Sequence, residues 1–501
     1  MIAWIVTLLA AILNVAAWST PGSPLCATLG WSAIVLFIPA LLIPTNRLRR
    51  FFIAGCVTYI GGFYWLYSTI KDFGGFPTIA ALAIYALFVA GSAVQFLIWA
   101  FSFQFLPQWM GKAGIRTAVA WLIAHHFWIK IFPWDFGHTQ LAFVPFAQVG
   151  QVAGVTGITF LMMWVCEAFV ARKMTTLLAK TAAILALGSA LMFGKTTEIS
   201  FNDSNNTRGT PLQTYLVQGN VSLHHKHDVT YFTVNREQYL TLSAKALGHA
   251  GLDSLVIWPE STITDFIPAS SRDARNSKLL PFLNNGAAFL VGALTYSSRT
   301  EYHNSSVLIR PDGSVAEPYH KMILMPFGEY TPLSSVLPFL KDINATAGQF
   351  TAGTEAAVLS FPLSSGAEVK LSPLICYEDI VPSMARDAVN KGAELLINQT
   401  NDAWFGDTVA PYQHHIIAAF RAIENDRYLL RSTNTGLTAV VDPLGRTLAS
   451  LLPYTEGILP VEIALRNTRT IFSRFPIPLL WLIGAAVAVI MVIRRAIPSK
   501  R

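Results

Sequence analysis

Residues 371–379 read Leu-Ser-Pro-Leu-Ile-Cys-Tyr-Glu-Asp, and this stretch decides how the chain is interpreted. Residues 374–376 form a short apolar run that predicts a buried strand, and two carboxylates, Glu378 and Asp379, follow at once. Enzymes often place reactive side chains where a strand ends at the edge of a sheet, so Cys376 is a candidate nucleophile. The alternative is that Cys376 is a small buried hydrophobic residue, as most free cysteines are.

The composition divides the chain into apolar and ordinary parts. The 501 residues are 53% hydrophobic and only 13% charged, with a mean hydropathy of +0.45, which is too apolar for an ordinary soluble protein. The excess lies in residues 1–195 and 477–493, whereas residues 200–470 have the composition of a soluble domain large enough to bury its own core.

Eight apolar runs are near the length that a bilayer requires. They cover residues 2–18, 29–44, 51–70, 77–106, 114–132, 153–171, 178–194 and 477–493. The sequence therefore predicts a polytopic membrane domain of seven helices over 1–195, a soluble domain over 196–470, and a last transmembrane helix with its tail over 471–501.

The basic residues predict the orientation of these spans. They gather in the loops 45–50, 107–116 and 172–180 and in the C-terminal tail, all of which lie on one side if there are eight spans. The positive-inside rule places that side, and both termini, in the cytoplasm, and the soluble domain outside it. Arg466, Arg469 and Arg474 disagree with this rule, and the earlier loops outweigh them. The net charge of +7 is explained by these loops, so no nucleic-acid partner is expected.

Two polar features of the membrane part are candidates for a functional role. His125 and His126 lie within an apolar run, and ionisable groups there are functional suspects. The long outer loop at 133–152 begins Pro-Trp-Asp-Phe-Gly-His-Thr-Gln. Its aromatic residues are typical of an interfacial belt, and a path for lipid toward the soluble domain is the alternative interpretation.

Cysteine usage excludes two classes of site. Of the four cysteines, only Cys376 lies in the soluble part, so a disulfide framework is excluded there. No paired Cys/His spacing of the zinc type occurs, and no metal is expected.

The soluble part alternates strand and helix signals, which predicts an α/β layered domain. Strands are expected at 214–218, 255–258, 288–294, 305–310, 395–398 and 437–441, with a helix over 231–248. The strand at 255–258 is followed by Pro259, which cannot continue a hydrogen-bonded ladder, so Glu260 is expected at a strand end. Taken alone, Glu260 is more commonly an exposed loop acid.

Three motifs follow one another along this background. They are Trp-Pro-Glu ending at Glu260, His-Lys ending at Lys321 with Pro-Phe-Gly-Glu-Tyr at 326–330, and Cys-Tyr-Glu at 376–378. Together with eight membrane runs, the motifs resemble the apolipoprotein N-acyltransferase family, a membrane-bound branch of the nitrilase, or carbon–nitrogen hydrolase, superfamily. Supporting stretches are Val-Gln-Gly-Asn at 217–220, Asn-Asp-Ala-Trp-Phe-Gly-Asp at 401–407 and Arg-Ser-Thr-Asn-Thr-Gly at 431–436. After the Gln-Gly-Asn segment, His227 stands at a position where the resemblance leads us to expect a tryptophan.

The resemblance implies a nitrilase-like αββα sandwich and a triad of Glu260, Lys321 and Cys376. A further implication is a multi-pass protein of a bacterial inner membrane, with the soluble domain on the periplasmic side. It also implies supporting or substrate-binding roles for Glu329, Tyr377 and Glu378. The implied reaction passes a fatty acyl chain from a phospholipid, through a cysteine thioester, to the N-terminal amine of a diacylglyceryl-modified apolipoprotein, without a cofactor. Glu260 is expected to take the thiol proton, and Lys321 to stabilise the thiolate and the oxyanion.

Two rival functions use the same chain differently. A membrane-anchored amidase would hydrolyse a C–N bond with the same triad, but a soluble substrate requires one anchor and not eight spans. A catalytically inactive lipid- or lipoprotein-binding protein would not need the intact set of Glu260, Lys321 and Cys376.

Overall fold

The computed structural model describes the chain except for residues 205–208, 249–252, 275–285, 327, 331–349 and 476–501. The expected last span over 477–493 therefore lies outside the described residues. The chain divides into two compact units. The helical unit comprises Met1–Tyr64, Leu82–Ser200 and Thr470–Arg501, and the α/β unit comprises Trp65–Ala81 and Phe201–Arg469.

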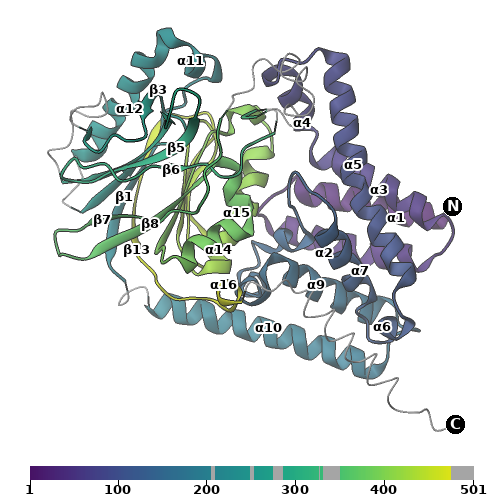
Figure 1. Ribbon diagram of the computed structural model, residues 1–501. Coiled ribbons are helices and arrows are strands. Elements are labelled where there is room, and N and C mark those ends of the chain that lie inside the picture. The colour runs from purple at the N-terminus through teal and green to yellow at the C-terminus, as the bar shows by residue number, and fades with distance from the viewer. Residues whose placement is uncertain (205–208, 249–252, 275–285, 327, 331–349, 476–501) are drawn as a thin grey trace. The chain divides into compact units, whose positions relative to one another are not determined.

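The helical unit contains most of the apolar runs (Figure 1). Its longer elements are α1 (Ile2–Trp18), α2 (Pro24–Leu42), α3 (Arg47–Gly62), α5 (Thr78–Phe105), α7 (Arg116–Phe127), α9 (Gly150–Val170) and α10 (Leu177–Ser204). Its short helices are α6 (Gln108–Lys112), η2 (Phe136–Gln140), α8 (Val144–Ala147) and α16 (Ile471–Arg474). Within the described residues, α2, α5, α9 and α10 are long and apolar enough to cross a membrane, and α3 makes a fifth span if it is counted with the segment that follows it.

Two expected spans differ from the helices found. The run 51–70 is interrupted after α3, and α4 (Trp65–Ser68) with η1 (Thr69–Phe73) belongs to the α/β unit. Two glycines, at 61 and 62, end α3, since glycine favours helix termination. The run 114–132 yields only the twelve residues of α7, which rise about 18 Å at 1.5 Å per residue, because the chain leaves the helix at Trp128.

The loop after α7 is folded into the core of the helical unit. Trp134, Asp135 and Phe136 are completely or almost completely buried. The Asp135 carboxylate accepts hydrogen bonds from Trp121 Nε1 at 2.9 Å and Thr159 Oγ1 at 2.6 Å. A belt of interfacial aromatics was therefore the wrong expectation for this part of the loop, since neighbouring helices cover its rings. His125 Nδ1 lies 3.4 Å from Asp135 Oδ2, so this histidine belongs to the same buried group.

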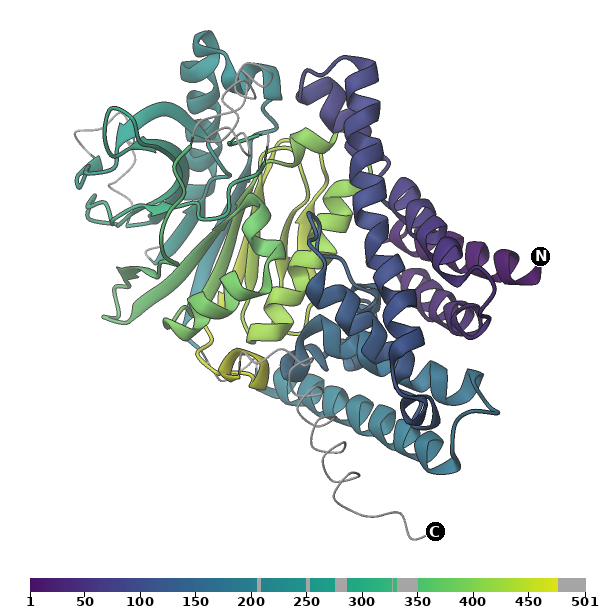
Figure 2. The ribbon, with the colours of Figure 1, turned by 45° about the vertical axis from the view of Figure 1, so that its right-hand side comes forward.

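The α/β unit is built from two sheets (Figures 1 and 2). The first has the order β13 (Gly457–Ala464), β1 (Pro211–Gln218), β2 (Ser254–Ile257), β4 (Ala288–Tyr296), β5 (Tyr302–Ile309) and β6 (Tyr319–His320), with β3 (Ile263–Pro268) also paired to β4. The second has the order β12 (Thr447–Leu451), β11 (Thr438–Val441), β10 (Leu429–Thr433), β9 (Leu395–Thr400), β8 (Glu368–Ile375) and β7 (Leu359–Pro362). All the strands expected from the sequence are present.

The sheets face each other through contacts of β1 with β10 and of β5 with β8. Helix α12 (Phe232–Leu247) packs on the first sheet, and α14 (Pro382–Asn390) and α15 (Ala410–Asn425) pack on the second (Figure 1). The unit is thus an α–β–β–α sandwich, and the α/β expectation is confirmed.

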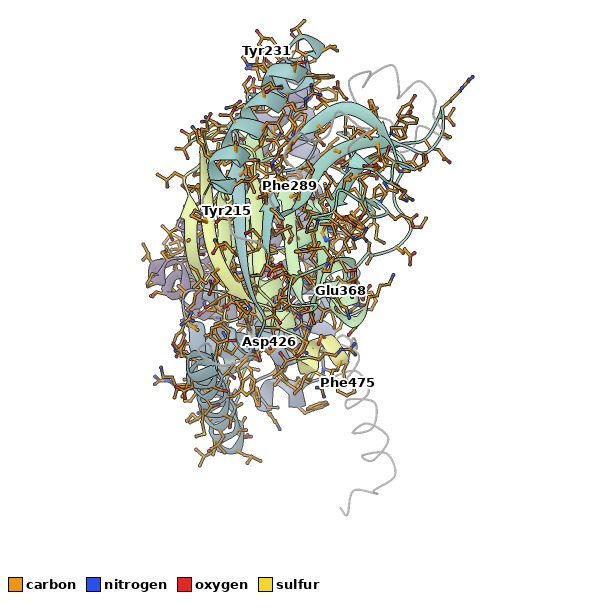
Figure 3. The ribbon with its side chains drawn as sticks, turned by 90° about the vertical axis from the view of Figure 1, so that its left-hand side faces the viewer. Tyr215, Tyr231, Phe289, Glu368, Asp426 and Phe475 are labelled. Atoms are coloured by element: carbon orange, nitrogen blue, oxygen red, sulfur yellow. The ribbon has the colours of Figure 1, made fainter. Side chains whose placement is uncertain are left out.

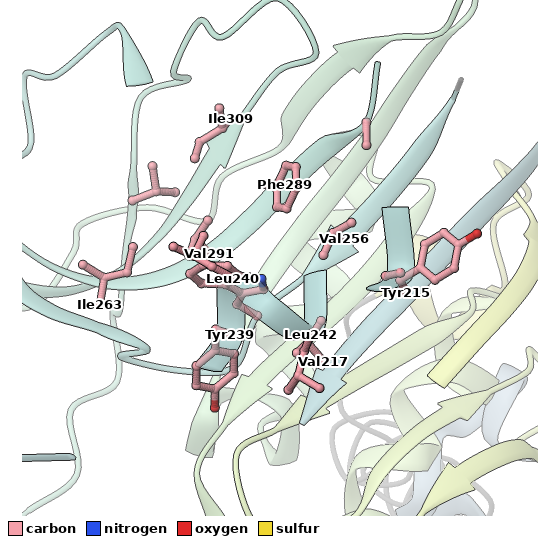
Figure 4. Packing of buried hydrophobic residues seen from close by; sticks show 14 of the residues in the cluster. Tyr215, Val217, Tyr239, Leu240, Leu242, Val256, Ile263, Phe289, Val291 and Ile309 are labelled. Carbon is pink, nitrogen blue, oxygen red and sulfur yellow. The ribbon is translucent and has the colours of Figure 1, made fainter. Parts of the chain in front are cut away.

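The core between α12 and the first sheet explains why these segments pair. Val256, Phe289 and Val291 on the strands and Tyr239 and Leu242 on α12 are almost fully buried in one cluster (Figure 4). Each such side chain stabilises the fold by about 1.5–3 kcal/mol when it leaves water. In strands β1, β2 and β4, successive side chains are buried over most of the strand and do not alternate between core and solvent, because sheets or helices cover both faces.

Strand direction decides where the polar side chains gather. Strands β8, β9 and β10 are mutually parallel, as are β1, β2 and β4. Asp426 comes shortly before β10 and lies at the opposite end of the unit from Tyr231, just before α12 (Figure 3). The carboxyl ends of β8, β9 and β10 therefore point toward the end that carries Tyr231.

Candidate active site

Cys376 lies where β8 ends and η6 (Cys376–Ile380) begins, as the sequence predicts. Its backbone has φ = 51°, in the left-handed region that non-glycine residues seldom adopt. Strained backbone of this kind persists only where the surroundings enforce it. The side-chain amide of Asn398 contributes, because its Nδ2 donates to the carbonyl oxygens of Leu374 at 3.0 Å and Cys376 at 3.2 Å.

Glu378 also holds this turn, in a role that the sequence did not reveal. Its fully buried carboxylate accepts the backbone N–H of Ile375 at 2.7 Å, of Met322 at 2.6 Å and of Ile323 at 3.2 Å. The Tyr319 hydroxyl donates to it at 2.8 Å. Glu378 thus joins the turn at Cys376 to the segment that follows Lys321. Burial raises the pKa of Glu378 to about 7, and the N–H of Ile375 is foremost among the groups that oppose this rise.

Glu260 and Lys321 meet in the α/β unit although they are 61 residues apart. Lys321 Nζ lies 3.3 Å from Glu260 Oε1 and 2.8 Å from Glu329 Oε2, and its side chain is 2% exposed. Burial lowers the pKa of Lys321, but the negative charges of Glu329 and Glu260 outweigh it and raise this pKa well above the usual value. Lys321 is therefore a permanent buried cation.

A close backbone approach sets the position of Glu260. Gly292 on β4 has no side chain, and a Cβ there would lie 2.0 Å from the Pro259 carbonyl oxygen and 2.8 Å from the Glu260 Cα. Only glycine permits this contact. The backbone of β4 therefore packs directly against Pro259 and Glu260, the residues that follow β2.

Asn304 and Lys226 complete the group of charges and were missed from the sequence. Asn304 Nδ2 donates to Glu260 Oε1 and to Glu329 Oε1, each at 2.8 Å, so one amide orients both carboxylates. The buried Lys226 donates its Nζ to the Glu260 carbonyl oxygen at 2.7 Å. Asn304 lies among the polar residues His303, Ser305 and Ser306 of β5, and Lys226 lies in a polar, histidine-rich stretch, so the sequence carried no signal that would single out either residue. His227 beside it carries a side chain outside the described residues.

The electrostatics of Cys376 describe a thiol that is protonated at rest. Burial raises its pKa strongly, the negative charge of Glu260 raises it further, and the positive charge of Lys321 lowers it. Lys226 interacts with the same charges. Burial lowers the pKa of Lys226 to about 8, and the negative charges of Glu260 and Cys376 oppose this decrease. The structure thus brings Glu260, Lys321, Glu329 and Cys376 into one electrostatic group. Tyr377 follows the thiol in η6, partly exposed, and burial raises its pKa to about 12.

The arrangement can perform nucleophilic acyl chemistry. It offers a thiol at a strand end, a carboxylate that accepts a proton and a fixed cation for developing negative charge. Among the described residues, no group of three or more His, Cys, Asp or Glu side chains could hold a metal ion.

Comparison with known proteins assigns both parts of the chain. Residues 4–168 match the family described as "Apolipoprotein N-acyltransferase N-terminal domain", and residues 221–471 match "Carbon-nitrogen hydrolase". A protein of Geobacter metallireducens named apolipoprotein N-acyltransferase is 29% identical over 98% of this chain and 95% of its own. Proteins with the same name are 31% identical in Bradyrhizobium diazoefficiens, over 85% of this chain and 80% of their own, and 30% identical in Haemophilus influenzae, over 82% and 80%.

Solved structures of the nitrilase superfamily resemble the chain in part. An amidase from Nesterenkonia sp. aligns with a TM-score of 0.37 and 23% identity over 51% of this chain and 92% of its own. A branch 10 member of the superfamily from Saccharomyces cerevisiae aligns with a TM-score of 0.39 and 18% identity, over 58% and 96%.

Proposed function

The chain belongs to the apolipoprotein N-acyltransferase family, and from this membership we propose that it transfers a fatty acyl chain from a phospholipid to the N-terminal amine of a diacylglyceryl-modified apolipoprotein. The observation that carries the chemistry is the buried contact of Lys321 with Glu260 and Glu329 in the electrostatic field of Cys376. The resemblance to relatives along almost the whole chain, including the membrane part, favours this function over that of an amidase.

The first half-reaction acylates Cys376. Because the thiol rests protonated, Glu260 takes its proton as the sulfur attacks the acyl carbonyl, and the oxyanion forms beside the Lys321 ammonium. The C–O bond of the ester then breaks, and Glu260 returns the proton to the leaving oxygen. The products are lysophospholipid and a thioester on Cys376.

The second half-reaction passes the acyl group to the amine. The free α-amino group, with an ordinary pKa of about 7.7–8.0, attacks the thioester carbonyl. Glu260 takes a proton from the attacking nitrogen, the C–S bond breaks, and the sulfur regains a proton. We assign Glu329 to holding Lys321 and Glu260 in register, and Glu378 to holding the turn at Cys376, since these are the contacts that they make. Tyr377 remains assigned to substrate binding because it follows the nucleophile.

A covalent intermediate predicts a single round of lysophospholipid release. Purified enzyme mixed with phospholipid alone should release one equivalent of lysophospholipid and then stop, with an acyl mass added to Cys376. A short diacylglyceryl-modified peptide with a free N-terminus should discharge the adduct, whereas the same peptide acetylated at its N-terminus is the control and should not. Mass spectrometry measures both species. Continuous release without an amine would favour the hydrolase, and no release at all would favour a binding protein.

For the membrane part we propose eight spans, seven over 1–195 and the last in 471–501, with the catalytic domain over 196–470 on the periplasmic side and both termini in the cytoplasm. The basic loops and the apolar helices α1, α2, α5, α9 and α10 support this arrangement.

The orientation predicts the activity of reporter fusions. Alkaline phosphatase, which is active only outside the cytoplasm, should be active when fused after Lys195 and silent when fused after Arg50. A reporter that is active only in the cytoplasm, fused at the same two points, is the control and should give the opposite pattern. Activity of the phosphatase after Arg50 with silence after Lys195 would place the catalytic domain in the cytoplasm.

A further inference from the structure

A second cluster of buried charges lies in the α/β unit, outside the group formed by Glu260, Lys321 and Glu329. It consists of Asp379 in η6, Asp402 in η7 (Asp402–Phe405), His414 on α15 and Arg431 on β10. His414 Nε2 lies 2.8 Å from Asp379 Oδ1, and its Nδ1 lies 3.0 Å from Asp402 Oδ1. Arg431 contacts Asp379 directly and approaches Asp402 at 3.9 Å.

The geometry determines the charge on His414. A carboxylate oxygen only accepts hydrogen bonds, and each ring nitrogen faces one, so both nitrogens carry a proton and the ring is an imidazolium. Burial lowers the pKa of His414, but the charge of Asp379 and then that of Asp402 outweigh burial and the repulsion from Arg431, and raise this pKa to about 9. The negative charges of Asp379 and Asp402 are then balanced by the positive charges of His414 and Arg431. A neutral ring would leave one net negative charge buried in the same turn as the Cys376 thiol.

The cluster joins two segments that flank the nucleophile. Asp379 belongs to the same short helix as Cys376. In the parallel pair β8–β9, Ile375 stands opposite Gln399, and a hydrogen bond from the Thr400 side chain lowers the pKa of the Cys376 thiol. Thr400 is the last residue of β9, and η7 begins at Asp402. His414 therefore bridges the turn that carries the thiol and the loop beside it.

The segment η7 is also fixed on its other side. The Thr69 hydroxyl donates to the Trp404 carbonyl oxygen at 2.9 Å, and the rings of Trp65 and Phe405 meet edge to face at 4.8 Å. A Cβ at Gly436 would lie 2.2 Å from Asp402 Oδ2, so the turn after β10 closes on this carboxylate. Trp404 and Phe405 are half-buried, and the ring of Phe405 also lies 6.3 Å from that of His414.

We propose that His414 is a positioning residue for acyl transfer, whose imidazolium locks the turn that carries Cys376 to the η7 segment and so holds the thiol in the position from which it attacks. This role rests on the proposed function. Four buried charges are poorly explained by stability alone, because well-packed apolar residues commonly replace such clusters without loss of folding stability. Their position, with one carboxylate in each segment flanking the thiol, gives the cluster a use in catalysis.

The test compares His414→Gln with His415→Gln. The control residue is the next one on α15, is also buried, and its Nε2 hydrogen-bonds with Thr447 Oγ1 at 2.9 Å. Burial and the positive charges of Arg431 and His414 lower its pKa to about 3, so its ring is neutral and adds no charge to the cluster. We expect His414→Gln to slow acylation of Cys376 by phospholipid about 10- to 100-fold. We expect His415→Gln to keep the wild-type acylation rate even where its melting temperature falls.

A second readout needs no lipid substrate and so separates this proposal from the proposed function. Iodoacetamide labelling of Cys376, followed by mass spectrometry over a pH series, should be slower in His414→Gln, by about tenfold for each unit by which the uncompensated charge raises the pKa of the thiol. His414→Lys, which restores the positive charge, should recover part of that rate. Wild-type labelling and wild-type acylation in His414→Gln would overturn the proposal, as would an equal loss in the His415→Gln control.

A variant that cannot be purified does not leave the proposal untested. Asp402→Asn removes one of the two carboxylates that hold the imidazolium but keeps the size of the side chain, so it should also slow acylation by about tenfold or more. Acylation at the wild-type rate by folded Asp402→Asn would overturn the proposal. A wild-type enzyme that labels normally with iodoacetamide but never releases lysophospholipid would instead contradict the proposed function.

Discussion

Replacing Cys376 by alanine is expected to abolish acyl transfer completely, because no other residue in this turn can carry the acyl group as a thioester. The protein should still fold, since the turn is held by the amide of Asn398 and the carboxylate of Glu378 and not by the sulfur. Cys376→Ser should also be almost inactive. A hydroxyl is far less acidic than a thiol, and the burial that already raises the pKa of the thiol would penalise an alkoxide even more.

The measurement is the acyl-enzyme formed with phospholipid alone, followed by the transfer of the acyl chain to a lipidated peptide. Cys56→Ala is the matched control, because Cys56 is also a partly exposed free cysteine but lies on α3 of the helical unit. The control should form the adduct at the wild-type rate, and all variants should have melting temperatures near that of the wild type. An acyl adduct that persists in Cys376→Ala would show that the nucleophile lies elsewhere.

Removing the buried cation should have the second-largest effect. Lys321→Ala is expected to lower the rate of acylation by about a hundredfold or more, the usual cost of removing one electrostatic contributor to an oxyanion site. The change also removes the cation between the buried Glu260 and the partly buried Glu329, so the melting temperature should fall.

Glu260→Gln separates the chemical effect from the structural one. Glutamine keeps the size of the side chain but cannot accept the thiol proton as a carboxylate does, so we expect a similar loss of rate with a smaller loss of stability. Lys391→Ala is the control, since this exposed lysine pairs with exposed Glu355 and should be silent in both measurements. Single-turnover acylation and thermal unfolding in detergent provide the two readouts. Near-normal acylation by Lys321→Ala would remove this lysine from the catalytic assignment.

Local patterns already placed the main residues of the site at strand ends. Short apolar runs at 255–258 and 374–376 predicted the strands that end near Glu260 and Cys376, because a strand covered on both faces buries successive side chains. Pro259 marked the end of one strand, and the abrupt change to charge marked the end of the other. The apolar runs of the helical unit were equally visible, since helix length and hydropathy are properties of contiguous residues.

Such local patterns did not predict where a helix breaks or which loop is buried. The run 51–70 has enough hydropathy for one span, yet the structure assigns Trp65 onward to the α/β unit, where the indole of Trp65 donates to the Gln413 side chain at 3.0 Å. The loop at Trp134 and Phe136 has the composition of an interfacial belt, but its rings are buried. Composition records how apolar a segment is and not which surface will cover it.

The sequence by itself determined the α/β class of the catalytic part, the membrane character of the rest, and the order of Glu260, Lys321 and Cys376. Only the tertiary structure decided that Asn304 orients two carboxylates, that Glu378 holds the nucleophile turn, and that His414 bridges Asp379 and Asp402. The physical reason is that a charged side chain is expected in water unless a partner accompanies it into the interior. Such partners come from strands and helices distant in the sequence, so their pairing exists only once the two sheets have packed.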